Sequence, residues 1–356
     1  MVSKAREKTD WRQRFTIDAC MMVKNEFMGI RKCLESIVGQ VDHVHIIDTG
    51  STDGTQDICR EFPNVTVYEE APDLFMTVAE DGMDRIHFSK TRNRTLAKSK
   101  AKWLLIVDGD EHFEFGKGLD FKAEVRKADK AKCNALGVSL TTNTDEGLAH
   151  EIQIRLLKND GSLSYEDPVH NQLVGPLKGV HLGGVAFHTS YKKEDRGAEK
   201  ESRAKPMLMK MYRQDPTSPK APYYLQTLAS VEKDYAASRK WSKICISLCE
   251  GEKHRNYSAR AWGFNIQNTL IMDGLDAAEK LTYEALMHHP YCPDIVRFRV
   301  AFALTRFDLT LQGIYPESGT YLSMPQKSLS VDTAKVAEAL QIGWPLVVVK
   351  NKENGE

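Results

Sequence analysis

The sequence predicts an α/β domain followed by an all-α domain, and three observations lead to this prediction. From residue 16 to about 110, short apolar runs alternate with segments of helical period, which is typical of βαβ units and a largely parallel sheet. The stretch 192–205 is almost entirely charged, as expected of a linker. Helical periodicity alone continues beyond it. We therefore expect domains at 1–195 and 196–312, with an extension of unknown role at 313–356.

Length and composition agree with a two-domain globular protein. The chain has 356 residues, of which 41% are hydrophobic and 28% charged, values that exclude disordered and fibrous classes. Lys plus Arg and Asp plus Glu both number 49, so the basic excess of a protein held to nucleic acid by charge is absent from the sequence. The longest apolar runs, 103–107 and 345–349, are far shorter than the roughly 20 residues of a membrane span.

The start of the chain and its cysteines predict a cytoplasmic location. The first fifteen residues carry five basic side chains and no apolar run of the kind that forms a signal peptide. The seven cysteines are odd in number and lack a C-x-x-C pair, which favours reduced thiols over a disulfide framework or a zinc site.

The first half of the chain supplies the parallel strands and their crossover helices. Strands are expected at 17–23, 43–48, 65–68 and 103–107, and the last is so apolar that it should be buried on both faces. Asn25 is expected to cap a helix that buries Phe27 and ends at Gly39. Further helices are expected from Asp53 to about residue 62 and from Ser89 to about residue 100, with a long acidic loop at 69–83.

The second half begins with strands and continues with helices. The strands expected at 135–140, 152–157 and 185–188 include antiparallel ones, and helices are expected at 207–212, 223–232, 235–249, 259–272, 275–288, 295–307 and 333–340. Similar segments at 235–237 and 276–278, with Ala285 and Pro290, suggest tetratricopeptide-like helical hairpins. These helices are expected to select an acceptor or mediate self-association; the alternative is that they only brace the sheet.

Two acidic residues follow the buried strand at 103–107. Asp108 and Asp110 are two positions apart at the carboxyl edge, where open α/β sheets bind ligands, and Gly109 lets a ligand approach the backbone. Hard carboxylate oxygens suit Mg²⁺ or Mn²⁺. The alternative is an acid-rich surface turn.

A second polar stretch, 48–55, also follows a strand directly. Its hydroxyls and glycines suit ligand binding, although helix capping alone explains several of them. The sequence contains neither a G-x-G-x-x-G nor a G-x-x-x-x-G-K-[ST] motif, which argues against a dinucleotide-binding or P-loop domain.

Taken together, the segments 22–26, 48–55, 88–93 and 104–111 resemble the GT-A glycosyltransferases of family 2. The later segments 155–158, 165–172 and 188–191 look like the subgroup in which this domain is followed by tetratricopeptide-like helices, so the resemblance covers about residues 16–310. It implies a GT-A-type, Rossmann-like mixed sheet followed by an all-α repeat domain. The implied activity is metal-dependent transfer of a sugar from a nucleotide diphosphate donor, with a UDP-sugar expected, to a macromolecular acceptor with inversion.

The resemblance also implies roles for individual residues. The nucleotide base would be flanked by two loops, which contribute Val23, Asn25, Glu26, Asp48 and Thr49. Arg92 would face the diphosphate, Asp108 would hold ribose and metal, and Asp110 would hold metal. Many relatives have an aspartate where this chain has Thr49, which leaves the base selectivity open.

Two histidines and two acids complete the implied site. His188 occupies the position of the late metal-binding histidine of GT-A enzymes, and His170 is a second candidate; a structural histidine is the alternative for each. The relatives' acid is replaced by Asn171 here, so we expect Glu166, and next Asp167, to take the proton of the acceptor. The alternative is a turn with solvated acids.

Other functions remain compatible with the sequence. One is a binding or scaffold protein, in which the repeats recruit a peptide and the first domain is a degenerate enzyme. Another is a nucleotidyltransferase, which lacks support because no glycine-rich basic loop follows the first strand. The possible acceptors are a peptide side chain, a saccharide or lipid-linked glycan, and a hydroxylated base in DNA.

Overall fold

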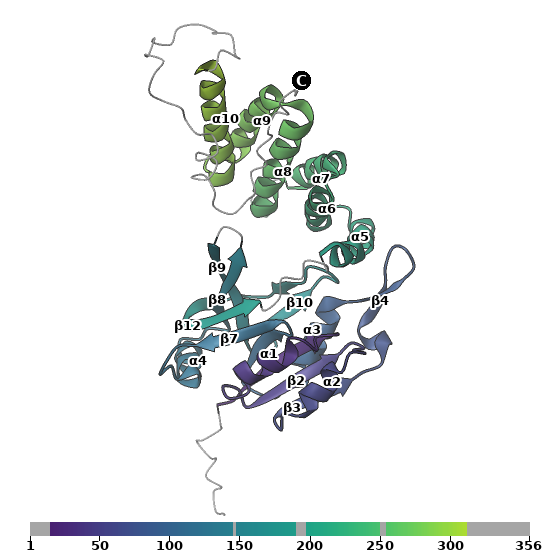
Figure 1. The fold of residues 1–356 in the computed structure, drawn as a ribbon, viewed down its shortest axis with the longest axis vertical. Coiled ribbons are helices and arrows are strands. Elements are labelled where there is room, and N and C mark those ends of the chain that lie inside the picture. The colour runs from purple at the N-terminus through teal and green to yellow at the C-terminus, as the bar shows by residue number, and fades with distance from the viewer. Residues whose placement is uncertain (1–14, 145–146, 190–196, 250–253, 312–356) are drawn as a thin grey trace, which may run out of the picture. The chain divides into compact units, whose positions relative to one another are not determined.

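The computed structural model describes residues 15–144, 147–189, 197–249 and 254–311 (Figure 1). The chain divides into two compact units, Met1–Met207 and Leu208–Glu356. The division falls inside helix α5 (Gly197–Gln214), whereas the sequence analysis placed a boundary at 195. The extension at 313–356, with the helix expected at 333–340, lies outside the described residues, as does the segment 190–196 of the charged linker.

The first unit is built on an eight-stranded mixed sheet of order β3-β2-β1-β6-β9-β8-β12-β7. Its strands are β1 (Ile17–Val23), β2 (His43–Asp48), β3 (Val65–Glu69), β6 (Trp103–Asp108), β7 (Glu111–Phe115), β8 (Ala135–Thr144), β9 (Gly147–Lys158) and β12 (Gly179–Thr189). Strands β3, β2, β1 and β6 are parallel neighbours, and β9 pairs antiparallel with both β6 and β8. The predicted mixed α/β sheet is therefore confirmed.

Helices cover one face of this sheet, and a helix with a small sheet covers the other. Buried side chains of α1 (Ile30–Ile37), α2 (Thr55–Arg60) and α4 (Phe121–Lys130) pack on one face, and α3 (Phe88–Leu96) lies over the other with β10 (Ser164–Glu166) and β11 (Gln172–Val174). Strand β6 alternates between the two cores, so it is buried on both faces as predicted.

The structure corrects the sequence analysis at three places. Helix α1 begins at Ile30 rather than after Asn25, which has a positive φ of 54°, and Phe27 is 48% exposed. The loop expected at 69–83 contains a 3-10 turn, η1 (Pro72–Leu74), and strand β4 (Met76–Val78), which pairs with β5 (Asp84–Ile86). Strand β7 and helix α4 were not predicted.

The second unit consists of successive helices among its described residues: α6 (Lys220–Val231), α7 (Tyr235–Leu248), α8 (Arg255–Asp273), α9 (Leu275–His288) and α10 (Pro293–Leu311). The buried residues Ser238, Ser242 and Cys245 of α7 recur 40 positions later in α9 as Ala278, Thr282 and Ala285. The spacing and small size of these residues match helical hairpins that repeat, as the sequence predicts.

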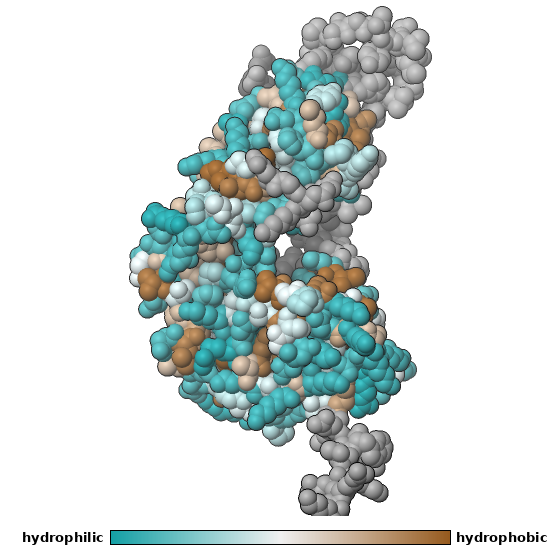
Figure 2. All heavy atoms as spheres, turned by 180° about the vertical axis from the view of Figure 1, so that it is seen from behind, coloured by the Kyte–Doolittle hydropathy of each residue, from teal (hydrophilic) through white to brown (hydrophobic). Residues whose placement is uncertain are grey.

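No described helix is long and apolar enough to cross a membrane. On the face shown in Figure 2, hydrophobic residues form small patches separated by hydrophilic surface.

Candidate active site

Three neighbouring parallel strands end at the same edge of the sheet. Val23 of β1 is in register with Asp48 of β2, and Met22 is in register with Asp108 of β6. The loops that follow these strands therefore meet, as expected at the carboxyl edge of an open α/β sheet.

The loop after β2 holds the loop after β1 in place through hydrogen bonds. Ser51 Oγ accepts the N–H of Asn25 at 2.9 Å, Thr55 Oγ1 accepts that of Glu26 at 2.8 Å, and Asp53 Oδ2 accepts that of Phe27 at 3.0 Å. The Asn25 Oδ1 atom in turn accepts the N–H of Thr52 at 2.8 Å. The two hydroxyls and the Asp53 carboxylate thus hold the loop after β1 in place, and Asp53 Oδ1 also accepts the N–H of Thr55, the first residue of α2, at 3.0 Å.

Asp48 is buried, and its two carboxylate oxygens have different environments. Oδ1 accepts the N–H groups of Gly50 and Ser51, both at 2.8 Å. Oδ2 is buried without a hydrogen-bond partner among the residues that the structure describes. An unsatisfied buried acceptor costs about 1–3 kcal/mol, so this atom suits the N–H of a ligand. The neighbouring Thr49 instead donates its hydroxyl to the carbonyl oxygen of Val23 at 3.0 Å.

Asp108 lies between two arginines. Its Oδ1 accepts from Arg92 Nη2 at 2.9 Å, and its Oδ2 from Arg155 Nη1 at 3.4 Å. Burial alone would raise the pKa of Asp108, but the two guanidinium groups outweigh this effect and hold the pKa well below its usual range. Asp108 is therefore a carboxylate whose charge is already balanced by the protein.

Glu111 is a second buried acid at this edge. Its Oε2 accepts the N–H of Asp108 at 3.0 Å, and its Oε1 accepts from Arg155. Burial and the nearby charge of Asp108 raise the pKa of Glu111 to about 8. Arg155 also lies over the ring of Phe187, with its guanidinium carbon 4.4 Å from the ring centroid.

The turn that carries Asp110 is packed tightly against the first loop. A Cβ atom at Gly109 would lie 2.9 Å from Glu26 Cγ and 3.3 Å from Val23 Cγ1, so only glycine fits there without displacement. Asp110 itself is half-buried between β6 and β7. The structure thus brings the predicted residues of the first, second and third loops together.

Helix α3 fastens the loop that carries the predicted base. The Asn93 side chain donates to the carbonyl oxygen of Tyr165 at 2.8 Å and accepts its N–H at 2.9 Å, and the Ser89 hydroxyl donates to the carbonyl oxygen of Asp167. Arg92, on the same helix, lies over the Tyr165 ring with its guanidinium carbon 5.3 Å from the centroid. The helix that reaches Asp108 therefore also positions the neighbours of Glu166.

The two predicted acids and His170 occupy an irregular segment. Glu166 is exposed at the end of β10, and Asp167 is half-buried with a positive φ of 74°. His170 is exposed and has a φ of 50°. Positive φ values at two non-glycine residues are uncommon and cluster at functional sites.

His188 lies on β12 beside the edge strand β7. Its ring stacks on that of His112, with centroids 4.9 Å apart, and its Nε2 lies 3.2 Å from Glu114 Oε2. The structure therefore associates His188 with two residues of β7 that the sequence analysis did not select.

Comparison with known proteins identifies the first unit. Residues 18–150 match the family described as Glycosyl transferase family 2. Residues 18–150 therefore carry the sequence pattern of a family 2 glycosyltransferase domain. The match covers β1, β2, β3 and β6 with all three loops described above.

Two curated relatives are similar in sequence to this chain. The SPbeta prophage-derived glycosyltransferase SunS of Bacillus subtilis is 23% identical over 301 residues, which are 81% of this chain and 67% of that protein. A TPR repeat-containing protein of Synechococcus elongatus is 27% identical over 155 residues, 43% of this chain. The match spans about a third of the length of the Synechococcus protein, 34%.

Solved structures of TarS from S. aureus are similar as well. Its fragment 1–349 in complex with UDP matches with a TM-score of 0.40 and 14% identity, over 86% of this chain and 94% of that one. The complex with UDP-GlcNAc gives a TM-score of 0.39 and 13% identity, over 84% and 92% of the two chains.

The sequence analysis gave Arg155 no role and did not place Glu111 beside Asp108, although both residues stand in segments that carry the family resemblance. A signal was present for Arg155, because a charged residue directly before Leu156 and Leu157 in an apolar strand requires a buried partner. The partners of Arg155 are Asp108 and Glu111. They meet Arg155 because β6 pairs with β9, and the sequence does not specify this pairing.

Proposed function

We propose that this family 2 glycosyltransferase moves a sugar from a UDP-sugar to a macromolecular acceptor with inversion at the anomeric carbon. The observation that carries the proposal is the buried, unpartnered Oδ2 of Asp48 beside the Val23–Glu26 loop. A carboxylate oxygen only accepts hydrogen bonds, so it favours a base with an N–H on its edge, as uracil has at N3. In this proposal, the loops after β1 and β2 flank the base.

The charges near Asp108 support binding of a diphosphate and ribose. Arg92 and Arg155 carry two positive charges that Asp108 balances only in part, and a departing nucleoside diphosphate develops negative charge. We assign Asp108 to the orientation of these arginines and to the ribose. Fixed donors of this kind act on the developing charge without reorganisation.

Mn²⁺ or Mg²⁺ fits Asp110 better than Asp108. Both oxygens of Asp108 face guanidinium groups, whereas Asp110 is a half-buried carboxylate on the turn between β6 and β7. We therefore assign the cation to Asp110. When bound, it would neutralise the diphosphate leaving group.

Glu166 or Asp167 takes the acceptor proton in this proposal. Inversion requires a base on the side of the sugar opposite to the leaving group. Both acids lie on the loop that α3 fastens through Asn93 and Ser89, and α3 also carries Arg92. The donor-binding arginine and the base thus share one rigid support.

We assign the recognition of a macromolecular acceptor to the helical unit. Among its described residues, Tyr283, Met287 and Tyr291 are large, apolar or aromatic, and 54%, 84% and 86% exposed. Exposed apolar side chains of this size favour contact with a partner.

All seven cysteines are free, which supports a reducing, cytoplasmic location as part of the proposal.

A donor panel tests the function. Purified protein is incubated with Mn²⁺ and a set of UDP-, GDP- and CDP-sugars, and mass spectrometry measures which donor is hydrolysed or transferred. We expect a UDP-sugar to be consumed. Consumption of GDP- or CDP-sugars alone, or of none, would contradict the proposal.

Calorimetric titration with UDP then tests the carrying observation. Because a hydrogen bond to a charged group contributes about 1.5–3 kcal/mol, Asp48→Asn should bind UDP about tenfold to a hundredfold more weakly. Asp57→Asn is the matched control, since that side chain is 84% exposed on α2. Equal UDP affinity in the parent and Asp48→Asn would refute the role of Asp48.

A further inference from the structure

Two histidines and a glutamate lie together on the last two strands of the sheet. Strand β7 is the edge strand of the described sheet and pairs antiparallel with β12, which places His112 directly opposite His188. Glu114 is two residues after His112, so both side chains point to the same face of the strand. That face is opposite to the one where Phe113 and Phe187 stack in the core.

The distances within this cluster are short, but its polar atoms are not saturated by one another. The imidazole rings of His112 and His188 are stacked 4.9 Å apart with an interplanar angle of 19°. His188 Nε2 lies 3.2 Å from Glu114 Oε2, yet this buried nitrogen has no aligned hydrogen-bond partner among the described residues. The three side chains each have one ligand atom within 4.8 Å of the other two.

This donor set is one that transition metals prefer. Two imidazole nitrogens and one carboxylate oxygen suit Zn²⁺, Co²⁺ or Ni²⁺ better than Mg²⁺, which prefers oxygen ligands alone. Ligands about 2.1 Å from a tetrahedral Zn²⁺ lie roughly 3.4 Å from one another. Small side-chain rotations achieve this spacing, because the Glu114 side chain is 64% exposed and free to move toward the histidines.

We propose that His112, Glu114 and His188 bind a divalent transition metal ion of the Zn²⁺ class. Three protein ligands leave a coordination position open for water or another oxygen ligand. The site draws none of its ligands from Asp108, whose oxygens face Arg92 and Arg155. It does not rest on the proposed function, since the ion binds without donor or acceptor.

Titration of the tag-free, metal-free chain with Co²⁺ tests the site. We expect saturable 1:1 binding with visible absorption bands of Co²⁺ in a site of low symmetry, displaced by Zn²⁺. Zn²⁺ should also raise the melting temperature of the protein, because a ligand that binds only the folded state stabilises it. Absence of saturable Co²⁺ and Zn²⁺ binding would overturn the proposal.

Variants locate the ion. His112→Phe keeps a stacked ring and removes the ligand atom, and Glu114→Gln keeps the shape and removes the charge; each should weaken Co²⁺ binding at least tenfold and abolish the Zn²⁺-dependent rise in melting temperature. His181→Phe is the control, because His181 is an exposed histidine on the same strand β12. It should bind Co²⁺ as the parent does.

The variant Asp110→Asn distinguishes metal binding at His112, Glu114 and His188 from metal binding at Asp110. We expect this variant to keep Co²⁺ binding. If Asp110→Asn abolishes binding while His112→Phe and Glu114→Gln retain it, the ion is held elsewhere and the assignment is wrong. These experiments measure metal binding rather than sugar transfer, so their outcome is independent of the proposed activity.

Discussion

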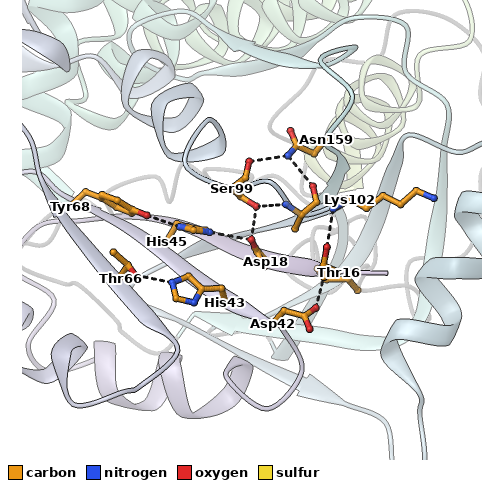
Figure 3. A network of polar contacts seen from close by, with 12 residues as sticks. Thr16, Asp18, Asp42, His43, His45, Thr66, Tyr68, Ser99, Lys102 and Asn159 are labelled. Carbon is orange, nitrogen blue, oxygen red and sulfur yellow. Dashed lines mark hydrogen bonds and ion pairs between the residues drawn. The ribbon is translucent and has the colours of Figure 1, made fainter. Parts of the chain in front are cut away.

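Asp18 and Asp48 are buried acids on neighbouring strands, and their surroundings differ. Asp18 is the second residue of β1, where its Oδ2 accepts the Ser99 hydroxyl at 2.6 Å and lies 3.1 Å from His45 Nε2. Figure 3 shows this network, which continues from His45 Nδ1 to the Tyr68 hydroxyl at 3.0 Å. Asp48 is the last residue of β2, and its Oδ2 has no such partner among the described residues.

The two acids indicate that one sheet contains two kinds of buried polar group: those that stabilise the fold and those that are left to bind a ligand. The network around Asp18 satisfies its polar groups with side chains of three strands and the segment after α3, so its contribution is to stability. At the carboxyl edge, Asp48 retains an unsatisfied oxygen and two arginines share one aspartate. Changes at the first place should affect folding, and changes at the second should affect donor binding and turnover.

The largest effect is expected at Asp110. In the proposed function, Asp110 holds a cation whose stabilisation of the leaving group is worth several kcal/mol. Asp110→Asn removes this charge, so sugar transfer should fall about a thousandfold. The melting temperature should remain close to that of the parent, because the residue lies on a turn. Steady-state rates with and without Mn²⁺ measure this effect, and full activity of the variant in the presence of a chelator would contradict it.

The next effect concerns the loop that α3 fastens. Glu166→Gln or Asp167→Asn, whichever removes the base, should lower kcat about a hundredfold while the UDP affinity is unchanged. Single-turnover rates and UDP titrations separate the two quantities. Normal rates in both variants would place the base elsewhere, with Glu111 or the 69–83 segment as the next candidates.

The interior network should respond in stability rather than activity. Asp18→Ala leaves His45 and Ser99 without their shared acceptor, so the free energy of unfolding should fall by about 2–3 kcal/mol. Urea denaturation measures this change, and the KM for the donor should be the same as in the parent. If Asp18→Ala instead lost donor affinity at unchanged stability, the distinction between the two regions would fail.

The last prediction concerns how the free energy of unfolding depends on pH, which should be opposite for Asp18 and Glu111. Burial raises the pKa of Asp18, but hydrogen bonds from His45 and Ser99 lower it overall, so its contribution to stability is present at neutral pH and lost as the pH falls through the folded-state pKa. The pKa of Glu111 is raised to about 8. Its contribution to stability is therefore complete at pH values below the pKa of an unfolded glutamate and is lost as the pH rises through 8. The two acids should therefore dominate opposite limbs of the stability profile.

Amide variants resolve these limbs. Asp18→Asn should flatten the acid limb of the stability profile, and Glu111→Gln should flatten the alkaline limb. Urea unfolding between pH 3 and pH 9 provides the comparison. A steeper alkaline loss of stability in Glu111→Gln would show that the folded protein prefers the ionised glutamate.

The sequence by itself determined most strands of the large sheet, most helices and the place of the acidic residues at its carboxyl edge. The apolar run of five residues at 103–107 specifies β6 because burial on both faces requires it, and Asp108 directly follows this run. Similar segments at 235–237 and 276–278 likewise indicated repeated helical hairpins, although the buried small residues of α7 and α9 repeat after 40 positions rather than 41. Local periodicity contains this information because it depends on neighbours along the chain.

Tertiary structure alone decided which polar groups meet. Asn25 caps no helix because side chains of the segment 51–55 accept the N–H groups of its loop, across 26–29 residues of sequence. Arg155 reaches Asp108 and Glu111 only because β9 pairs antiparallel with β6, and His112 meets His188 only through the pairing of β7 with β12. These contacts depend on strand register between distant segments, which hydrophobic pattern constrains to a face of the sheet but not to a partner.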